Sequence, residues 1–198
     1  MTVIGLVRHG ITEWNLAGIA QGSSDVSLND TGKSQAAALA DRLASEGPWD
    51  MIVSSDLARA KETAEIISEK LAMPISFFDT RLREMSGGEI EGTTETQRLE
   101  KWGENWRGLD LGMETSDSVT QRGMEAVDSI LTEFKGKRVL VVSHGALIGI
   151  TLRSMLPGRF EKTDLQNTSI TMLEHSGSEW DCTLYNCVKH LETAGIRD

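Results

Sequence analysis

The sequence has few cysteines, no excess of basic residues and no long hydrophobic run. Its two cysteines are Cys182 and Cys187. On one extended strand they would lie roughly 16 Å apart on opposite faces, too far apart for a disulfide. Their spacing does not resemble a zinc site, and a reducing cytoplasm is the simplest location. The formal net charge of −10 argues against a nucleic-acid or anionic membrane partner, because both require a basic face.

The hydrophobic segments are all short. The N-terminal apolar run Val3–Val7 ends at Arg8-His9 after the length of one strand. No stretch reaches the ~18 apolar residues of a membrane span, so we expect neither a secretory signal nor a membrane span. The 198 residues suit one domain, and an apolar fraction of 39% with 25% charged residues is typical of a globular protein.

Short apolar runs alternate with helical patterns along most of the chain. Strands are expected at residues 3–7, 51–53, 74–78, 139–142, 169–174 and 180–187, and helices at 31–44, 57–71, 117–134 and 146–155. This alternation predicts an α/β fold with a mostly parallel sheet covered by helices on both faces.

Residues 79–116 are the least regular part of the chain. They are rich in glycine, and only Leu99, Trp102 and Trp106 have the spacing of a short amphipathic helix. Such a stripe is more often part of a core than a cover over a substrate. We therefore expect a single domain over residues 1–198, with a lid-like irregular insertion at about 79–116.

Basic side chains follow three of the predicted strands. Arg8 and His9 follow the first, His144 follows the strand at 139–142, and Arg59 falls in the first turn of the helix after residues 51–53. Ligands of open α/β sheets bind beyond the carboxyl ends of the parallel strands, so one shared site is expected. Arginine matches phosphate oxygens in pairs, and neutral histidine is a competent covalent nucleophile. The amides that begin the helix after His144 would add donors to this site.

Several sequence blocks, in order, resemble those of the histidine phosphatase (phosphoglycerate mutase-like) superfamily. They are LVRHGITEWN from Leu6 to Asn15, Gln21-Gly22 with the helix that follows, SSDLARA from Ser54 to Ala60, the loop with Leu82-Arg83-Glu84 and Glu91-Gly92, and Val142-Ser143-His144-Gly145. A lone RHG would be weak, but the blocks together span Val3 to about Leu156 and are highly specific. The resemblance implies a three-layer α/β/α sandwich.

The resemblance also implies a metal-independent phosphatase that needs no cofactor and acts on a small phosphorylated substrate. His9 would attack phosphorus, while Arg8, Arg59 and His144 hold its oxygens. Glu84 would protonate the leaving oxygen and then help to activate water. Asn15, Gln21, Gly22 and Gly145 are expected to assist at the same phosphoryl site.

A cofactor-dependent phosphoglycerate mutase is the main alternative within the family. A mutase must hold a second anionic group and exclude water, which requires additional cations and a closed lid. Here the segment from Thr93 to Ser116 is short and carries only scattered cations, namely Arg98, Lys101 and Arg107. Gln21 and Ala146 also differ from the residues typical of the mutases. Water is therefore favoured as the acceptor, and a catalytically silent module that binds phosphorylated ligands is a further alternative.

Ordinary structural explanations exist for several of these residues. His9 and His144 could be buried core histidines, and Arg59 could form a surface ion pair with Glu62 or Asp56. The intact motifs favour the catalytic interpretation. Glu89 is a rival proton donor to Glu84. His175 and His190 match no motif and are interpreted as surface residues, and the physiological substrate and the oligomeric state stay open.

Overall fold

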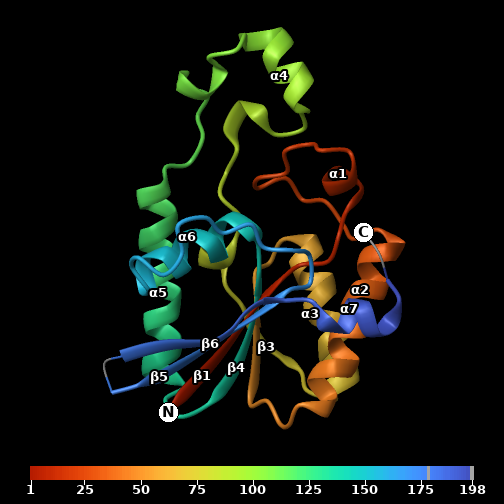
Figure 1. Cartoon of the computed structure of the whole chain (residues 1–198), viewed down its shortest axis with the longest axis vertical. Helices are drawn as coiled ribbons and strands as arrows, with labels where there is room; N and C mark the ends of the chain where they lie inside the picture. Colours follow the sequence, from red (N-terminus) through yellow and green to blue (C-terminus); the bar gives the residue numbers. More distant parts are fainter. Residues whose placement is uncertain (178, 197–198) are drawn as a thin grey trace.

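The computed structural model describes residues 1–177 and 179–196, and it places a central sheet between two layers of helices (Figure 1). The strands are β1 (Thr2–Arg8), β2 (Met51–Ser54), β3 (Ile75–Phe78), β4 (Arg138–Ser143), β5 (Ile170–Ser176) and β6 (Glu179–Cys187). The helices are α1 (Glu13–Leu16), α2 (Asp30–Ser45), α3 (Ala58–Leu71), α4 (Glu95–Trp102), α5 (Ser116–Glu133), α6 (Gly145–Met155) and α7 (Lys189–Ala194). Short 3₁₀ turns lie at Thr80–Leu82, Gly88–Ile90 and Trp106–Gly108.

The sheet is mostly parallel, as predicted. Its order in the described part of the chain is β3-β2-β4-β1-β5-β6. The first four strands in this order are parallel. At one side of the sheet, β5 pairs antiparallel with β1, and β6 pairs antiparallel with β5. Arg8 is paired with Ser143, and Ser54 with Val142. The carboxyl ends of β1, β2 and β4 therefore meet at one edge of the sheet, where the predicted site residues begin.

Alternate side chains of the strands form two separate cores. On β4, Val139 and Val141 pack with α5 and α6, whereas Leu140 and Val142 pack with α2 and α3. This alternation follows from the two-residue period of a strand. Fully burying each such side chain contributes about 1.5–3 kcal/mol. The three-layer prediction is confirmed, and no helix within residues 1–177 and 179–196 has the length and hydrophobicity to cross a membrane.

The first turn of α3 is bonded to a side chain from another loop. The N-cap residue of α3 is Leu57, which makes no side-chain cap hydrogen bond. Instead, Asp25 Oδ1 accepts a hydrogen bond from the Ala58 amide at 2.6 Å. The loop before α2 is thereby tied to the helix that carries Arg59.

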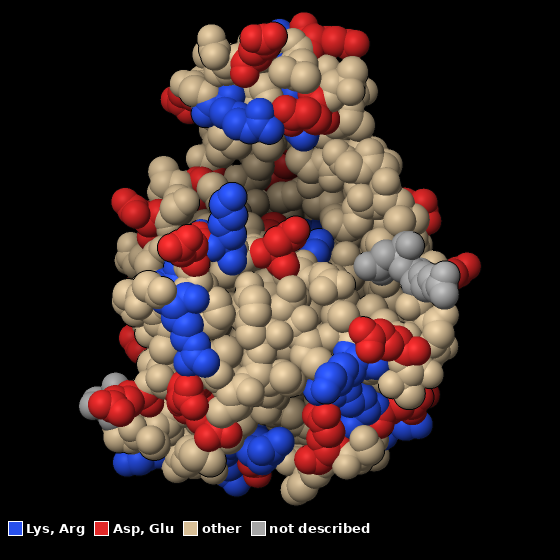
Figure 2. All heavy atoms as spheres, in the orientation of Figure 1, with Lys and Arg blue, Asp and Glu red and all other residues tan. Residues whose placement is uncertain are grey.

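The segment between β3 and α5 extends beyond the carboxyl edge of the sheet, and α4 is its most distant part (Figure 1). Figure 2 shows the surface hollowed between this segment and the body of the molecule. The predicted amphipathic helix is present as α4, but Gly103, with φ 79°, ends it before Trp106. Trp106 is nevertheless buried, and its indole nitrogen donates to Glu95 at 3.1 Å. Within this segment, the Trp106 ring also lies against the guanidinium groups of Arg98 and Arg107.

Candidate active site

His9 and His144 lie side by side at the carboxyl ends of β1 and β4. Both are buried, and their ring centroids are 5.2 Å apart. His9 Nδ1 lies 2.7 Å from the carbonyl oxygen of Gly10. Because a carbonyl oxygen only accepts, Nδ1 carries the ring proton and donates it. The lone pair of a neutral His9 is therefore on Nε2.

Arg59 contacts the side of His9 that holds this lone pair. Its Nε donates to His9 Nε2 at 3.2 Å. Its two terminal nitrogens donate to the carbonyl oxygens of Ser24 and Gly22, each at 2.8 Å. The side chain is buried, so the alternative of a surface ion pair is wrong. The proposed surface partners are engaged elsewhere, Asp56 with Arg83 and Glu62 with the Leu28 amide.

Burial and neighbouring cations keep both histidines neutral. The pKa of His9 is lowered well below its usual 6.5, first by burial, then by Arg59 and Arg8. Burial and the same arginines lower the pKa of His144 in the same way. Burial also lowers the pKa of Arg59 to about 10, although nearby carboxylates, Glu84 foremost, oppose this. Arg59 still carries its charge at neutral pH, so positive charge is concentrated here in a chain of net charge −10.

His144 is held from one side only. Its Nε2 lies 2.8 Å from the hydroxyl oxygen of Ser55. Nδ1 is buried and has no hydrogen-bond partner among the described residues. If Nδ1 carries the ring proton, Ser55 donates to Nε2, and Nδ1 is a donor for an anionic oxygen. Ser55 thus positions the ring of His144.

Arg8 is fixed at both its backbone and its side chain. Its amide donates to the carbonyl oxygen of Ser169 at 3.2 Å, and its guanidinium donates to the carbonyl oxygen of Leu165. A Cβ at Gly145 would come within 3.3 Å of Arg8 Nε. Gly145 therefore allows the guanidinium to lie against the start of α6.

Glu84 is held at the N-terminus of α6. Its Oε2 accepts from the Ala146 amide at 3.1 Å, and its Oε1 accepts from the amides of Leu147 at 3.0 Å and Met85 at 2.9 Å. The amides that begin α6 were expected to face the ligand. The structure corrects this expectation for two of them, since they hold Glu84. The rival donor Glu89 is exposed.

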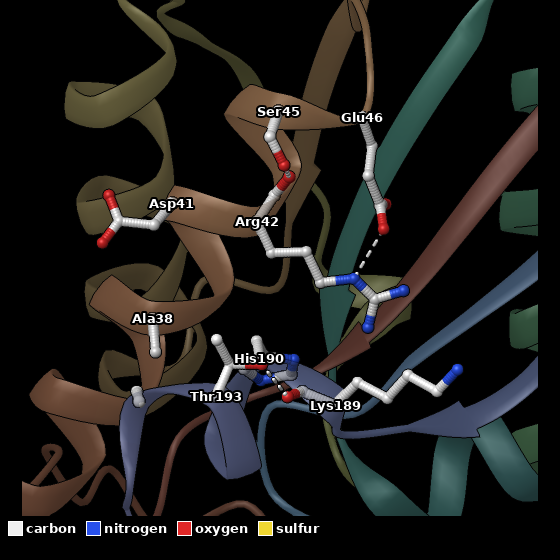
Figure 3. Close-up of a pocket in the computed structure, with 9 residues that line it drawn as sticks. Ala38, Asp41, Arg42, Ser45, Glu46, Lys189, His190 and Thr193 are labelled. Atoms are coloured by element: carbon white, nitrogen blue, oxygen red, sulfur yellow. Dashed lines mark hydrogen bonds and ion pairs between the residues drawn. The ribbon is translucent and has the colours of Figure 1, made fainter.

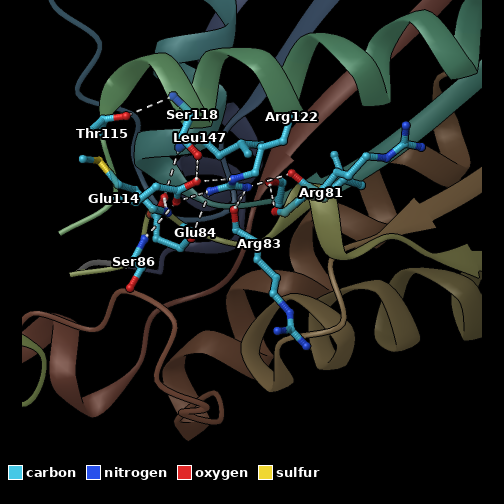
Figure 4. Close-up of polar contacts among 12 residues, drawn as sticks. Arg81, Arg83, Glu84, Ser86, Glu114, Thr115, Ser118, Arg122 and Leu147 are labelled. Carbon is cyan, nitrogen blue, oxygen red and sulfur yellow. Dashed lines mark hydrogen bonds and ion pairs between the residues drawn. The ribbon is translucent and has the colours of Figure 1, made fainter. Parts of the chain in front are cut away.

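Arg122 on α5 fixes the backbone that carries Glu84 (Figure 4). Its terminal nitrogens donate to the carbonyl oxygens of Arg81 at 2.7 Å, Arg83 at 2.6 Å and Glu84 at 3.2 Å. It also pairs with Glu114, and this contact lowers the pKa of Glu114 to about 2. No motif indicated this residue, because its partners are backbone atoms some 40 positions away along the chain.

Glu91 connects the loop of Glu84 with the loop that holds Arg59. Its carboxylate accepts from the amides of Ser23 and Gly87, each at 2.8 Å, and from the Ser24 hydroxyl at 2.7 Å. Partial burial raises the pKa of Glu91, but these hydrogen bonds outweigh it and the net pKa is lowered. Gly22 has φ +48°, and a Cβ there would come within 2.2 Å of the Glu91 carboxylate. Only glycine fits this turn without displacing Glu91.

Asn15 and Gln21 both accept hydrogen bonds from Thr12, and Asn15 also lies near an Asn167 side chain that contacts His9. The Thr12 hydroxyl donates to Gln21 Oε1 at 3.0 Å, and the Thr12 amide donates to Asn15 Oδ1 at 3.2 Å. Asn167 Nδ2 donates to the carbonyl oxygen of His9 at 3.0 Å and lies 3.5 Å from Asn15 Oδ1. Since both side-chain oxygens are engaged, the amide nitrogens of Asn15 and Gln21 are the groups that can serve a ligand.

Comparison with known proteins shows the family to which the chain belongs. The sequence profile of the histidine phosphatase superfamily (branch 1) matches residues 4–188. The chain belongs to this superfamily. The uncharacterized phosphatase PhoE of Bacillus subtilis (strain 168) is 36% identical over 193 residues, which cover 96% of this chain and 97% of PhoE.

Two further relatives are named for phosphoserine. A metal-independent phosphoserine phosphatase of Arabidopsis thaliana is 35% identical over 206 residues, covering 99% of this chain and 86% of that protein. A solved structure of a phosphoserine phosphatase mutant from Entamoeba histolytica, in complex with phosphoserine, has a TM-score of 0.81 at 29% identity. The structural match covers 96% of this chain and 100% of the Entamoeba chain.

Metal ligands do not converge in the described part of the molecule. No group of three or more His, Cys, Asp or Glu side chains there is placed to hold a metal ion. Arg8 and Arg59 place positive charge beside the two histidines, whose pKa values both arginines lower. The arrangement suits a tetrahedral anion placed between His9 Nε2, the two guanidinium groups and His144 Nδ1.

Proposed function

We propose that this chain is a metal-independent phosphomonoester hydrolase that forms a phosphohistidine on His9. The observation that carries the proposal is the hydrogen bond of His9 Nδ1 to the Gly10 carbonyl oxygen, at 2.7 Å. It fixes the tautomer in which Nε2 is the nucleophile. The lowered pKa of His9 keeps that nitrogen unprotonated at neutral pH.

In the first step, the lone pair of His9 Nε2 forms a bond to phosphorus while the ester P–O bond breaks. Arg59 exchanges its contact with Nε2 for contacts with phosphoryl oxygens, and Arg8 and His144 Nδ1 donate to the same group. Glu84 enters this step protonated and gives its proton to the leaving oxygen, which departs as an alcohol; it regains a proton from water in the second step. Preorganised donors of this kind stabilise the charge that develops in the transition state.

In the second step, water attacks the phosphorus of phosphohistidine. The carboxylate of Glu84 takes a proton from this water, and the P–N bond breaks. Inorganic phosphate leaves, and His9 returns to its neutral form with the proton still on Nδ1. The contacts of Glu84 with the α6 amides support the second of these roles, since they hold the side chain beside the site and stabilise the carboxylate that takes the proton from water.

We further propose that the substrate is a small phosphorylated metabolite, covered in the bound state by residues 79–116. The hydrogen bonds of Gly92 to Ala20 at 2.9 Å and of Ala20 to Thr93 at 3.0 Å support a cover anchored beside the phosphoryl site. Phosphoserine is the first candidate, because two relatives carry it in their names. The free thiols of Cys182 and Cys187 support a cytoplasmic location.

Hydrolysis of p-nitrophenyl phosphate and of a series of phosphomonoesters, including phosphoserine and 3-phosphoglycerate, tests the proposal. We expect turnover by the wild type with or without EDTA, and none by His9→Ala. Wild-type rates in His9→Ala would remove His9 as nucleophile. A protein silenced by EDTA and rescued by a divalent ion would require another mechanism, and phosphoryl transfer to 3-phosphoglycerate faster than hydrolysis would indicate a mutase.

A further inference from the structure

His190 is a buried histidine that the mechanism above does not use. The interpretation of His190 as a surface residue is wrong, because it lies on α7 and is only 4% exposed. The helix was not predicted because it has only six residues. Figure 3 shows His190 beside the cavity between α2 and α7, which has a volume of about 650 Å³. Its Nε2 lies 3.1 Å from the hydroxyl oxygen of Thr168.

Thr168 is held in an unusual backbone conformation. It is fully buried with φ 53°, a region that β-branched residues rarely adopt. Its hydroxyl donates to the carbonyl oxygen of Asn167 at 2.8 Å. A hydroxyl has one proton, so Thr168 accepts from His190, whose Nε2 must then carry the ring proton. Burial and then Arg42 lower the pKa of His190 to about 4, so the neutral ring persists at neutral pH.

The same short segment contacts both Arg8 and His9. The Thr168 amide donates to the carbonyl oxygen of His9 at 3.2 Å, and Asn167 Nδ2 donates to the same oxygen at 3.0 Å. The carbonyl oxygens of Ser169 and Leu165 accept from the amide and the guanidinium of Arg8. Residues 165–169 therefore contact and position both His9, the proposed nucleophile, and Arg8, one of the two phosphate-binding arginines.

We propose that His190 is a positioning residue, which acts through Thr168 to hold residues 165–169 against His9. This inference rests on the proposed function, because it takes His9 as the nucleophile. His190 touches none of the groups that would meet the substrate. Its loss should therefore misplace the nucleophile while leaving the affinity for the phosphoryl group largely intact.

Four substitutions test the hydrogen bond from both of its ends. His190→Leu and Thr168→Val remove it, whereas His190→Gln and Thr168→Ser keep a partner for it. His175→Leu is the matched control, since it removes a histidine whose ring packs on Trp180 and lies outside the segment at 165–169. We expect His190→Leu and Thr168→Val each to lower kcat by about 5- to 10-fold, the value of one hydrogen bond. KM and the inhibition constant for inorganic phosphate should change less than about twofold.

The double variant His190→Leu/Thr168→Val should be no slower than Thr168→Val alone, because Thr168→Val already removes the bond to His190 together with the bond to the Asn167 carbonyl oxygen. His190→Gln and Thr168→Ser should recover most of the rate, and His175→Leu should keep it. The proposal would be overturned by a wild-type kcat in His190→Leu or by a loss of kcat in His190→Gln as large as that in His190→Leu. Additive losses of kcat in the double variant would also overturn it. Thermal unfolding identifies a variant that does not fold. If His190→Leu does not fold, the comparison of kcat between Thr168→Val and Thr168→Ser tests the proposal in its place.

A second readout is independent of catalysis. Hydrogen exchange of the Thr168 amide, which donates to His9, should be at least severalfold faster in His190→Leu than in the wild type or His175→Leu. Unchanged exchange would contradict the inference even in an active enzyme. Faster exchange in a protein without phosphatase activity would support the positioning contact while refuting the proposed function, so the two failures can be told apart.

Discussion

The Nε of Arg59 donates to the Nε2 of His9 across 3.2 Å, so a buried guanidinium covers the lone pair of the proposed nucleophile. In this arrangement Arg59 has two roles. It lowers the pKa of His9 in the free enzyme, and it is already next to the position that a phosphoryl oxygen would take. Its other contacts are to the carbonyl oxygens of Ser24 and Gly22, which fix the plane of the guanidinium.

Substitution of Arg59 should show that geometry matters as well as charge. Arg59→Lys keeps a cation but loses the planar donors, and we expect kcat/KM to fall by about 100-fold; Arg59→Ala should lose about 1,000-fold. Steady-state kinetics with p-nitrophenyl phosphate measures both. Arg81→Lys is the control, because Arg81 pairs with Asp79 away from His9. Equal activity of Arg59→Lys and the wild type would contradict the proposed contacts.

The histidines of the site should titrate at unusually low pH. Burial, Arg59 and Arg8 lower the pKa of His9, and burial with the same arginines lowers that of His144. In an NMR titration of the free enzyme, the chemical shifts of the ring protons of His9 and His144 should therefore change only at pH values well below 6.5. The same histidines in urea-unfolded protein serve as reference and should titrate near ~6.5. Native values at or above the unfolded ones would contradict the electrostatics described.

Stability should fall on mild acidification. The native state resists protonation of His9, His144 and His190, whereas the unfolded chain binds those protons near pH ~6.5. The unfolded state therefore gains protons first, and the free energy of unfolding should decrease as pH falls from 6.5 to 5, above the range of ordinary carboxylates. Urea denaturation at several pH values measures this slope. It should be smaller in His190→Leu, and a flat profile in the wild type would count against the buried neutral histidines.

Glu84 should matter most for substrates with poor leaving groups. Glu84→Gln removes the proton donor, and we expect a loss of about 100-fold or more in kcat/KM for alkyl phosphomonoesters. The loss should be much smaller for p-nitrophenyl phosphate, since p-nitrophenolate leaves without protonation. Glu89→Gln is the matched control on an exposed carboxylate of the same loop. If Glu89→Gln showed the leaving-group dependence and Glu84→Gln did not, the two assignments would be exchanged.

Glu91 should affect phosphate affinity without touching phosphate. Glu91→Gln weakens the hydrogen bonds that hold Ser23 and Ser24, and Ser24 in turn accepts from Arg59. We expect the inhibition constant for inorganic phosphate to rise by about 10-fold, consistent with the loss of one or two charge-assisted hydrogen bonds. Glu104→Gln, on the exposed surface of the α4 segment, is the control. An unchanged inhibition constant would show that the loop at Ser23 and Ser24 positions Arg59 without the hydrogen bonds of Glu91.

The framework of the fold was predictable because its signals are local. The apolar runs at residues 3–7 and 139–142 became β1 and β4, with Arg8, His9 and His144 at their ends, as the sequence indicated. Arg59 lies in the first turn of α3 as predicted, because the helix begins at Ala58. Strand ends in a parallel sheet share one edge, so sequence position translated directly into spatial proximity.

The supporting contacts were not predictable because they join distant parts of the chain. Arg122 donates to the backbone around Glu84, and His190 contacts Thr168, yet neither pair has a periodic or motif-like signal. The helix-start amides of Ala146 and Leu147 were expected to serve the ligand, but the nearby carboxylate of Glu84 takes them. Charge compensation of this kind depends on the folded geometry and cannot be read from spacing alone.

The most direct test of the central claim is to identify the phosphorylated residue during turnover. Glu84→Gln should be mixed with p-nitrophenyl phosphate, quenched and unfolded in alkali, in which phosphohistidine survives, and analysed by peptide mass spectrometry. We predict one added phosphoryl group on the peptide that contains His9, lost after acid treatment and absent in His9→Ala/Glu84→Gln. Turnover with the label on another residue, or on none while the reaction proceeds, would contradict the account.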